Sequence, residues 1–349
     1  MTQLVELQDA LPRFQAAGIK LYAVSYDEAD ALAEFARHHG ITYPLLSDRG
    51  SKVIDRYGIR NHFVTEDQIP YYGIPFPGTY LTDEQGLVTA KFFHRNLAQR
   101  TSAESVLDSA LGAILLGKEE PHAIGGDGDI RVTATYHGGG GRLKSGFVRH
   151  VVVRFEIPPG LHIYGEPVPD GMVATKIRVS GPPGLHAGET VAPPTHPLAL
   201  PALGMELQVW DGRVDFSIPV FVDDRVVGII DDVPVEEVPI QVKIDYQACD
   251  DQCCRLPQGE TLTVKVPVAP YVGHDLTGKL SGTVSTTMDS RKFLLRKIVL
   301  GLLRSPIKGL KYLHLTWAQL QRGPVGRTDR RGRLAHTHRK DTDDPRTSA

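Results

Sequence analysis

Three cysteines are the residues of this 349-residue chain whose type and spacing point to chemistry. They are Cys249, Cys253 and Cys254, and the rest of the chain contains none. Because only four residues separate Cys249 from Cys254, a turn in the backbone could bring their Cα atoms within the roughly 7 Å that a disulfide needs. Such a bond is either a structural staple or a dithiol that cycles, and exposed, labile pairs are typical of the second role.

Composition excludes several classes of protein. The hydrophobic and charged fractions, 41% and 23%, are ordinary for a soluble globular protein, and the net charge of −2 indicates no nucleic-acid partner. The length predicts two to three domains. The sequence shows neither an apolar run of about 18 residues nor a secretory signal at its start, so no membrane span is expected. As given, this indicates the cytoplasm; a longer native start would leave an extracytoplasmic location open.

Residues 1–117 alternate between helical and extended patterns. Apolar residues recur at helical spacing over 4–14, and Gly18 follows as a helix end. A buried strand is predicted at 19–25, and two strands at 79–82 and 87–93. The remaining helices are predicted at 29–39, 51–57 and 102–116. This alternation favours an α/β layer architecture.

The order of these segments resembles the AhpC/TSA-type peroxiredoxin and thioredoxin-like redoxin family. The matching segments are QLVELQ at 3–8, YAVSYD at 22–27, YPLLSD at 43–48, YGI at 57–59 and PFPGTYLTDEQG at 75–86. The resemblance implies a thioredoxin-like fold. It also implies a cis peptide bond before Pro77, the position that faces the active cysteine in that family.

This half departs from the family in one respect. The family has a central strand and a reactive cysteine just before the segment that matches 3–6, but residues 1–248 contain no cysteine. The missing strand would lie between 19–25 and the hairpin at 79–93, leaving two strand edges without partners. We expect either that Met1 is internal to the native reading frame or that this half is an incomplete, scaffold-like redoxin.

A second domain is predicted after a linker. Residues 118–128 are polar and rich in Gly and Pro, which is typical of an interdomain linker. Over 129–272 the apolar residues follow period two, with strands expected at 130–136, 150–157, 174–179, 214–222, 238–246 and 261–268. Many short strands separated by Gly and Pro predict an all-β, immunoglobulin-like sandwich.

This second domain resembles the N-terminal domain of the thiol:disulfide interchange protein DsbD. The segments that carry the resemblance are PGLHIYG at 159–165, DG at 170–171, YQAC at 246–249 and CRLP at 254–257. The resemblance implies that Cys249 and Cys254 are a redox pair that exchanges electrons with thioredoxin-like partner proteins. Cys253 departs from the pattern, either as a competing partner or as an unpaired thiol. Tyr246 either shields the pair or is an ordinary core tyrosine.

The sequence predicts no metal and no cofactor, because His162, His186 and His196 fit no ligand spacing. Residues 285–322 read as a basic amphipathic helical segment. Its part 291–317 either contacts an anionic membrane surface or docks on the chain's own domains. Residues 323–349 read as a disordered tail.

Two hypotheses about function remain open. The first is a thiol–disulfide oxidoreductase or peroxiredoxin-like protein, with a peroxide or a protein disulfide as its substrate. It would join an incomplete α/β thioredoxin-like domain to an all-β immunoglobulin-like sandwich and a C-terminal helix. The alternative is a non-catalytic scaffold or binding protein with a structural disulfide and a degenerate redoxin domain. The reduction potential of the pair separates the two hypotheses.

Overall fold

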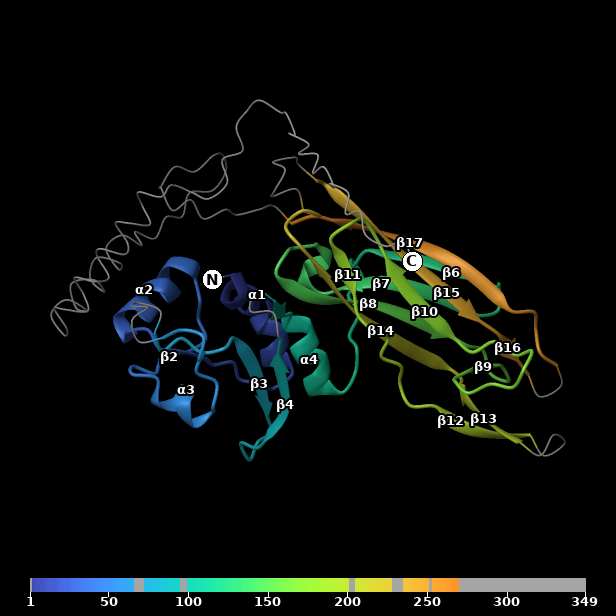
Figure 1. The fold of residues 1–349 in the computed structure, drawn as a ribbon, viewed down its shortest axis with the longest axis horizontal. Coiled ribbons are helices and arrows are strands. Elements are labelled where there is room, and N and C mark those ends of the chain that lie inside the picture. The colour runs from blue at the N-terminus through green and yellow to red at the C-terminus, as the bar shows by residue number, and fades with distance from the viewer. Residues whose placement is uncertain are drawn as a thin grey trace, which may run out of the picture. The chain divides into compact units, whose positions relative to one another are not determined.

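A computed structural model describes residues 2–65, 72–94, 99–200, 205–227, 235–250 and 253–269. Helices and strands alternate up to Leu111, and strands dominate the described residues after it (Figure 1). The segments predicted at 285–322 and 323–349, including the membrane contact at 291–317, lie outside the described residues. Within those residues, no helix is both long and apolar enough to span a bilayer.

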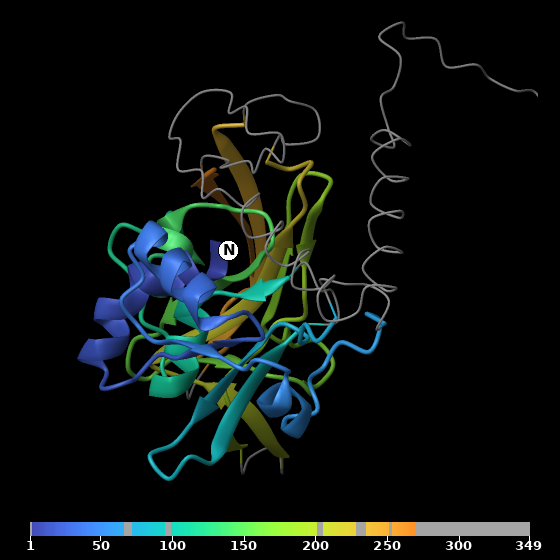
Figure 2. The ribbon, with the colours of Figure 1, turned by 90° about the vertical axis from the view of Figure 1, so that its left-hand side faces the viewer.

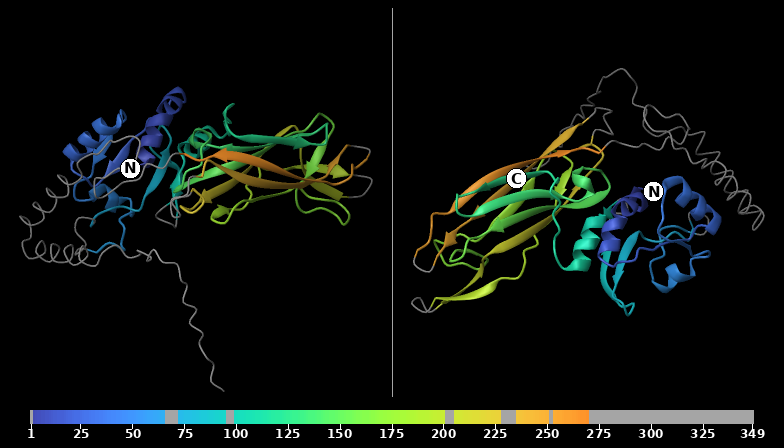
Figure 3. Two further views of the ribbon diagram at one scale, coloured as in Figure 1. Left: turned by 90° about the horizontal axis from the view of Figure 1, so that it is seen from above. Right: turned by 180° about the vertical axis from the view of Figure 1, so that it is seen from behind.

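The first domain contains short helices and small sheets. Its elements are α1 (Thr2–Ala16), β1 (Ala23–Ser25), α2 (Ala29–His39), β2 (Leu45–Ser47), α3 (Lys52–Arg56), β3 (Gly78–Thr82), β4 (Val88–Phe93), β5 (Arg100–Thr101) and α4 (Ala103–Leu111). α1 and α4 lie side by side (Figures 1 and 3), and their apolar faces meet at Phe14, Val106 and Leu107. The helical spacing of apolar residues in the sequence therefore predicts the buried face of α1 correctly.

Four strands of the first domain form two separate two-stranded sheets among the described residues, and β5 pairs instead with a strand of the second domain. β1 pairs in parallel with β2, whereas β3 and β4 form the antiparallel hairpin seen in Figure 2. The predicted buried strand at 19–25 needs correction: only Ala23–Ser25 is a strand, and Val24 is 47% exposed. Because β2 is the single described strand paired with β1, the other edge of β1 has no strand partner among the described residues.

The peptide bond before Pro77 also differs from the sequence prediction. Among the described residues the cis peptide bond is Glu166–Pro167, so the predicted cis bond at Phe76–Pro77 is wrong. The amide of Phe76 donates to the Ile59 carbonyl at 2.7 Å, and that of Asn61 to the Ile74 carbonyl at 2.9 Å. These bonds hold the segment extended, where the trans form that X–Pro bonds prefer is accommodated.

The second domain is built from three sheets. Its strands are β6 (His122–Gly126), β7 (Arg131–His137), β8 (Phe147–Glu156), β9 (His162–Tyr164), β10 (Lys176–Ser180), β11 (Leu185–Ala187), β12 (His196–Leu200), β13 (Met205–Trp210), β14 (Arg213–Val222), β15 (Glu237–Tyr246), β16 (Ala248–Cys249) and β17 (Gln258–Pro267). The sheets have the orders β11-β14-β8-β7-β6, with β5 joined to β8, then β10-β15-β17 and β12-β13-β9-β16. A 3₁₀ turn, η1 (Gly139–Gly141), follows β7.

The core of this domain lies between the sheets that contain β14 and β15. Buried and more exposed residues alternate along both strands, as period two requires. Phe155 and Phe216 meet edge to face at a centroid distance of 5.6 Å, and Phe155 meets Tyr246 at 5.3 Å. The apolar alternation in the sequence therefore identifies these core strands correctly.

The segment predicted as a linker, 118–128, contains strand β6. Residues His122–Gly126 pair antiparallel with residues 131–135 of β7, so that His122 lies opposite Thr135 and Gly126 opposite Arg131. A Cβ added at Gly126, where φ is +118°, would lie 1.9 Å from the backbone carbonyl oxygen of Ile130, so glycine is required at this position. The glycine-rich composition that suggests a linker reflects tight packing of an edge strand in this case.

Candidate redox site

The three cysteines lie in a turn that follows the long strand β15. Strand β16 continues the chain and pairs antiparallel with β9, which places Cys249 opposite His162. The turn is closed by hydrogen bonds between Asp250 and Cys253: the Asp250 amide donates to the Cys253 carbonyl at 3.0 Å. In return, the Cys253 amide donates to Asp250 Oδ1 at 2.7 Å. An Asp at the start of a tight turn commonly accepts such a bond, which is how this sequence reverses direction.

This turn joins Cys249 and Cys254 in a disulfide, with their Cα atoms 4.1 Å apart. The two partners differ strongly in exposure. Cys249 is 1% exposed and packs with Tyr164, Leu207 and Val209, whereas Cys254 is exposed. Cys253 is a free, exposed cysteine. An incoming thiolate therefore reaches the Cys254 side of the bond more readily than the Cys249 side.

Two side chains brace the turn. Gln247 accepts a hydrogen bond from the Val173 amide at 2.9 Å and donates one to the Arg255 carbonyl at 2.9 Å. Arg255 pairs with Asp129 at 2.7 Å and with Asp127 at 3.6 Å, which ties the turn to the connection between β6 and β7. The backbone after Cys254 is thus held on both sides, and the bracing orients the exposed sulfur.

A buried polar pair faces the disulfide from β9. Tyr164 Oη lies 3.7 Å from Cys254 Sγ, and His162 Nε2 lies 3.1 Å from Tyr164 Oη. Their side chains are 2% and 7% exposed, and the two rings meet edge to face. Burial raises the pKa of Tyr164, so its phenol stays protonated and can donate a hydrogen bond at neutral pH.

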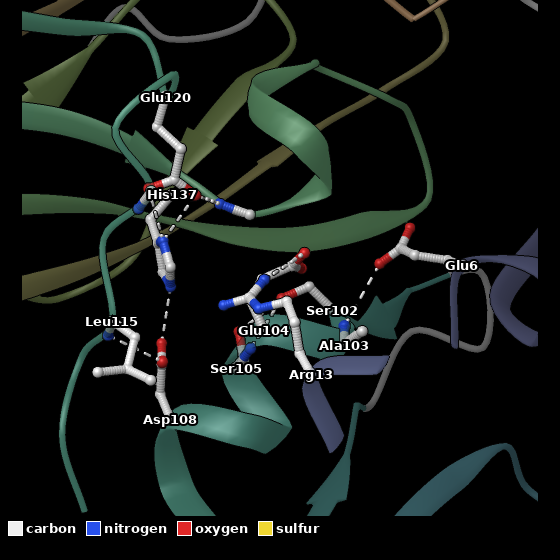
Figure 4. Close-up of polar contacts among 12 residues, drawn as sticks. Glu6, Arg13, Ser102, Ala103, Glu104, Ser105, Asp108, Leu115, Glu120 and His137 are labelled. Atoms are coloured by element: carbon white, nitrogen blue, oxygen red, sulfur yellow. Dashed lines mark hydrogen bonds and ion pairs between the residues drawn. The ribbon is translucent and has the colours of Figure 1, made fainter. Parts of the chain in front are cut away.

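A second cluster of charged side chains lies between the helices of the first domain and strands β7 and β8. Figure 4 shows His137 between Glu120 and Asp108, with Nδ1 2.9 Å from Glu120 Oε1 and Nε2 2.7 Å from Asp108 Oδ2. Burial alone would lower the pKa of His137, but the hydrogen bonds to these two carboxylates raise it to about 9. His137 is therefore a buried cation at neutral pH.

Arg149 of β8 is the second cation of this cluster. Its guanidinium bonds both carboxylate oxygens of Glu6 at 2.7 and 2.6 Å, and it bonds Glu104 at 3.3 Å. Glu6 belongs to α1 and Glu104 to α4, so this pair network connects both helices to the β domain. Each of these charges has an opposite partner, so the arrangement is that of a structural ion-pair network.

Two family models match separate segments of the chain. Residues 1–91 match the model of the AhpC/TSA family. Residues 145–266 match the model described as "Thiol:disulfide interchange protein DsbD, N-terminal". The chain thus carries a segment similar to the AhpC/TSA family, followed by a segment similar to the DsbD N-terminal domain. The disulfide lies inside the second match, because both Cys249 and Cys254 fall within 145–266.

Curated relatives match the AhpC/TSA part of the chain over short segments. Thiol-disulfide oxidoreductase ResA of Bacillus anthracis is 26% identical over 83 residues, which cover 24% of this chain and 40% of ResA. Putative peroxiredoxin Rv2521 of Mycobacterium tuberculosis (strain ATCC 25618 / H37Rv) is 33% identical over 95 residues, covering 26% of this chain and 57% of that protein. The chain thus spans between 40% and 57% of the length of these two relatives.

Solved structures with some similarity have low identity. The N-terminal periplasmic domain of ScsB from Proteus mirabilis is 17% identical, covers 43% of this chain and 49% of that chain, and has a TM-score of 0.27. The reduced DsbD N-terminal domain of Neisseria meningitidis is 16% identical, covers 44% and 96% respectively, and has a TM-score of 0.23. A complex between the DsbD N-terminal and PilB N-terminal domains from Neisseria meningitidis is 14% identical, covers 45% of this chain and 93% of that chain, and has a TM-score of 0.24.

The structure brings together only some of the predicted site residues. Cys249, Cys253 and Cys254 share the turn, but Tyr246 is fully buried in the core against Phe155. Pro77 precedes β3 in the segment that matches the AhpC/TSA model, whereas the turn lies in the segment that matches the DsbD N-terminal model. Among the described residues no group of three or more His, Cys, Asp or Glu has a metal-holding arrangement.

Sequence reasoning missed the roles of His162, Tyr164 and Gln247. His162 and Tyr164 lie in the segment PGLHIYG, which carries part of the DsbD resemblance, and their spacing of two residues places them on one face of a strand. That face meets the disulfide only because β9 pairs with β16, about 85 residues further along the chain. No local pattern in the sequence indicates that pairing.

Proposed function

We propose that the Cys249–Cys254 disulfide is a redox-active pair through which the chain exchanges two electrons with a thioredoxin-like partner protein. The observation that carries this proposal is the asymmetry of the pair: Cys254 is exposed in a surface turn, whereas Cys249 is 1% exposed. The family matches, the thiol-disulfide oxidoreductase and peroxiredoxin relatives, and the disulfide support a redox role.

The exchange follows ordinary thiol–disulfide chemistry. In one direction, the Cys254 thiolate attacks a disulfide of the partner, which releases one partner thiolate and forms a mixed disulfide. The Cys249 thiolate then attacks Cys254 Sγ, and the second partner thiolate leaves. The partner gains two electrons, the pair becomes the observed disulfide, and the two cysteine thiol protons pass to the departing thiolates. The same steps in reverse reduce the pair.

An apolar side chain beside the exposed sulfur supports a protein as the partner. Leu256 is 82% exposed and lies two positions after Cys254. Isolated exposed leucines are common in proteins, but this one is only two residues from the cysteine that must meet the partner. Contact with Leu256 would bury apolar surface during the exchange and favour a protein over a small thiol.

The proposal extends to the two domains. We propose residues 1–117 as a thioredoxin-like domain and 129–272 as an immunoglobulin-like sandwich that carries the reactive pair. Residues 1–248 contain no cysteine, so within this chain the turn at 249–254 performs the thiol chemistry.

A structural disulfide is the second candidate function. The hydrogen bonds of Gln247 and the ion pairs of Arg255 hold the turn on both sides, as expected of a disulfide whose role is to keep the turn rigid. In that case the chain would be a scaffold or binding protein whose disulfide closes the end of β15.

The reduction potential of the pair tests these alternatives. The full chain would carry Cys253→Ser, which removes the neighbouring thiol, and would be equilibrated with dithiothreitol and glutathione buffers of known potential. Alkylation and mass spectrometry then give the fraction of reduced pair. A potential above about −300 mV supports the exchange reaction, whereas a lower value indicates a structural staple and refutes it. Cys249→Ser in the same background defines the signal of a chain that cannot form the disulfide.

A further inference from the structure

The pairing of β9 with β16 places three buried side chains on one face next to the exposed sulfur. His162 and Tyr164 are two residues apart on β9, so they point to the same side of the sheet. Cys249 lies directly opposite His162 in the neighbouring strand. A line of contacts therefore leads from Cys254 Sγ to Tyr164 Oη over 3.7 Å, and from there to His162 Nε2 over 3.1 Å.

The direction of these hydrogen bonds follows from chemistry. A disulfide sulfur carries no hydrogen, so the Tyr164 hydroxyl must donate to Cys254 Sγ. Its single hydrogen is then used, and the contact with His162 requires that Nε2–H donate to the Tyr164 oxygen. In the oxidised protein both donors thus point toward the sulfur that becomes a thiolate when the disulfide opens.

We propose that Tyr164 and His162 form a proton relay for Cys254, with Tyr164 as a catalytic residue that contacts the reacting sulfur and His162 as a positioning residue. This inference rests on the proposed redox function of the pair. In the reduced protein, the Cys254 thiol gives its proton to the Tyr164 oxygen while the Tyr164 hydroxyl gives its own to His162 Nε2. The products are a Cys254 thiolate and a His162 imidazolium, so charge and protons balance.

The return step uses the same path. After the partner has accepted electrons, its leaving thiolate takes up the proton that His162 releases through solvent. When the pair is instead reduced and Cys254 leaves as a thiolate, the imidazolium of His162 returns a proton to it through Tyr164. Burial of Tyr164 prevents water from replacing its hydroxyl, and the tight packing keeps the two contacts in place.

The outer end of the relay has an exit to solvent. His162 lines a surface hollow of about 320 Å³ together with Leu161, His196 and Asp211. His196 Nε2 and Asp211 Oδ2 form a solvent-exposed pair at 3.0 Å on its rim. A proton on His162 can therefore pass to water in the hollow without crossing the apolar cluster around Cys249.

Other charged groups near Cys254 belong to the turn and its braces. Asp250 accepts from the amide of Cys253, and its Oδ2 lies 3.9 Å from Cys253 Sγ. Arg255 is paired with Asp129 and Asp127. These groups bias the charge at the sulfur, but the substitutions below leave all of them in place, so the comparison isolates Tyr164 and His162.

The test measures the reactivity of Cys254 in the full, reduced chain that carries Cys253→Ser. Alkylation with iodoacetamide from pH 5 to 9.5, followed by mass spectrometry of the Cys254 peptide, gives a pH–rate profile. Tyr164→Phe keeps the ring but removes the donor, and we expect it to raise the pKa of Cys254 by about one unit. Alkylation at pH 7 would then slow about tenfold. His162→Gln keeps a donor near Tyr164 but cannot accept a proton. It should therefore remove the part of the pH–rate profile that reflects titration of His162, which we call the histidine limb.

Control variants separate the relay from general effects. Tyr43→Phe removes a buried hydroxyl in the AhpC/TSA segment, and His186→Gln removes an exposed histidine on β11; neither should alter the profile. If Tyr164→Phe is poorly folded by near-ultraviolet circular dichroism, His162→Gln and His162→Asn provide the same test.

Each outcome has a definite meaning. A shifted profile in Tyr164→Phe together with a lost limb in His162→Gln supports the relay, whereas unchanged profiles in both overturn it. A shift in Tyr164→Phe alone overturns the role of His162. The reduction potential of the parent chain is measured in parallel. A potential typical of a structural disulfide refutes the redox function, whereas unchanged alkylation with a higher potential refutes only the relay.

Discussion

The buried cation His137 predicts a specific dependence of stability on pH. Its pKa is about 9 in the folded protein, against an ordinary value of 6.5 in an unfolded chain. Because the folded state holds this proton more tightly, the stabilisation is fully present below pH 6.5 and is lost as the pH rises through 9. The difference of about 2.5 pH units, at 1.36 kcal/mol per unit, corresponds to a loss of about 3 kcal/mol in the free energy of unfolding.

Urea denaturation of the full chain between pH 6 and 9.5 measures this loss. The chain would carry Cys253→Ser, because a free thiol would exchange with the disulfide at alkaline pH. Unfolding of the β domain is followed by circular dichroism, since His137 lies on β7. We expect the parent to lose about 3 kcal/mol over this range.

His137→Gln is the decisive comparison. Glutamine cannot carry the charge, so the variant should be less stable at pH 6.5 and should change by less than about 1 kcal/mol between pH 6.5 and 9.5. His186→Gln, an exposed site, should keep the full dependence of the parent. If His137→Gln shows the same loss as the parent, the assignment of the proton to His137 is refuted.

Three further predictions concern strand β8 and the turn that carries the cysteines. Burial lowers the pKa of His150 to about 4, so stability should fall as the pH drops from 6.5 toward 4, and His150→Gln should weaken that fall in urea titrations. Arg149→Met leaves Glu6 and Glu104 without their buried cation and should cost about 3–5 kcal/mol in the same assay; a loss below about 1 kcal/mol would contradict the network. Leu256→Asp should slow exchange with a thioredoxin about tenfold yet leave exchange with dithiothreitol unchanged, and equal slowing of both would argue against a docking role.

The strands of the β domain could be predicted from the sequence because their signal is local. Predicted strands at 214–222 and 238–246 correspond to β14 (Arg213–Val222) and β15 (Glu237–Tyr246). Alternation of apolar and polar residues is a direct consequence of the strand's period of two, so no knowledge of neighbouring strands is needed. The position of the turn with the cysteines could also be predicted from the sequence, because all three cysteines occur within a few residues.

Errors in the sequence analysis occur where a neighbour determines the structure. Residues 122–126 read as a linker because glycine usually indicates flexibility, yet they form strand β6, and Gly126 is required because a Cβ there would meet the backbone of Ile130. The strand predicted at 19–25 is shorter and more exposed than expected, because burial depends on the strands that pair with it.

The sequence by itself determined where thiol chemistry can occur and which strands form the β domain, since residue type and period two are properties of a local segment. Only the tertiary structure decided that Cys254 is the accessible partner and that Tyr164 and His162 face it. It likewise decided that Arg149 meets Glu6, 143 positions away in the chain. These contacts depend on the register of distant strands and on helix packing, and both are set by burial of the whole core.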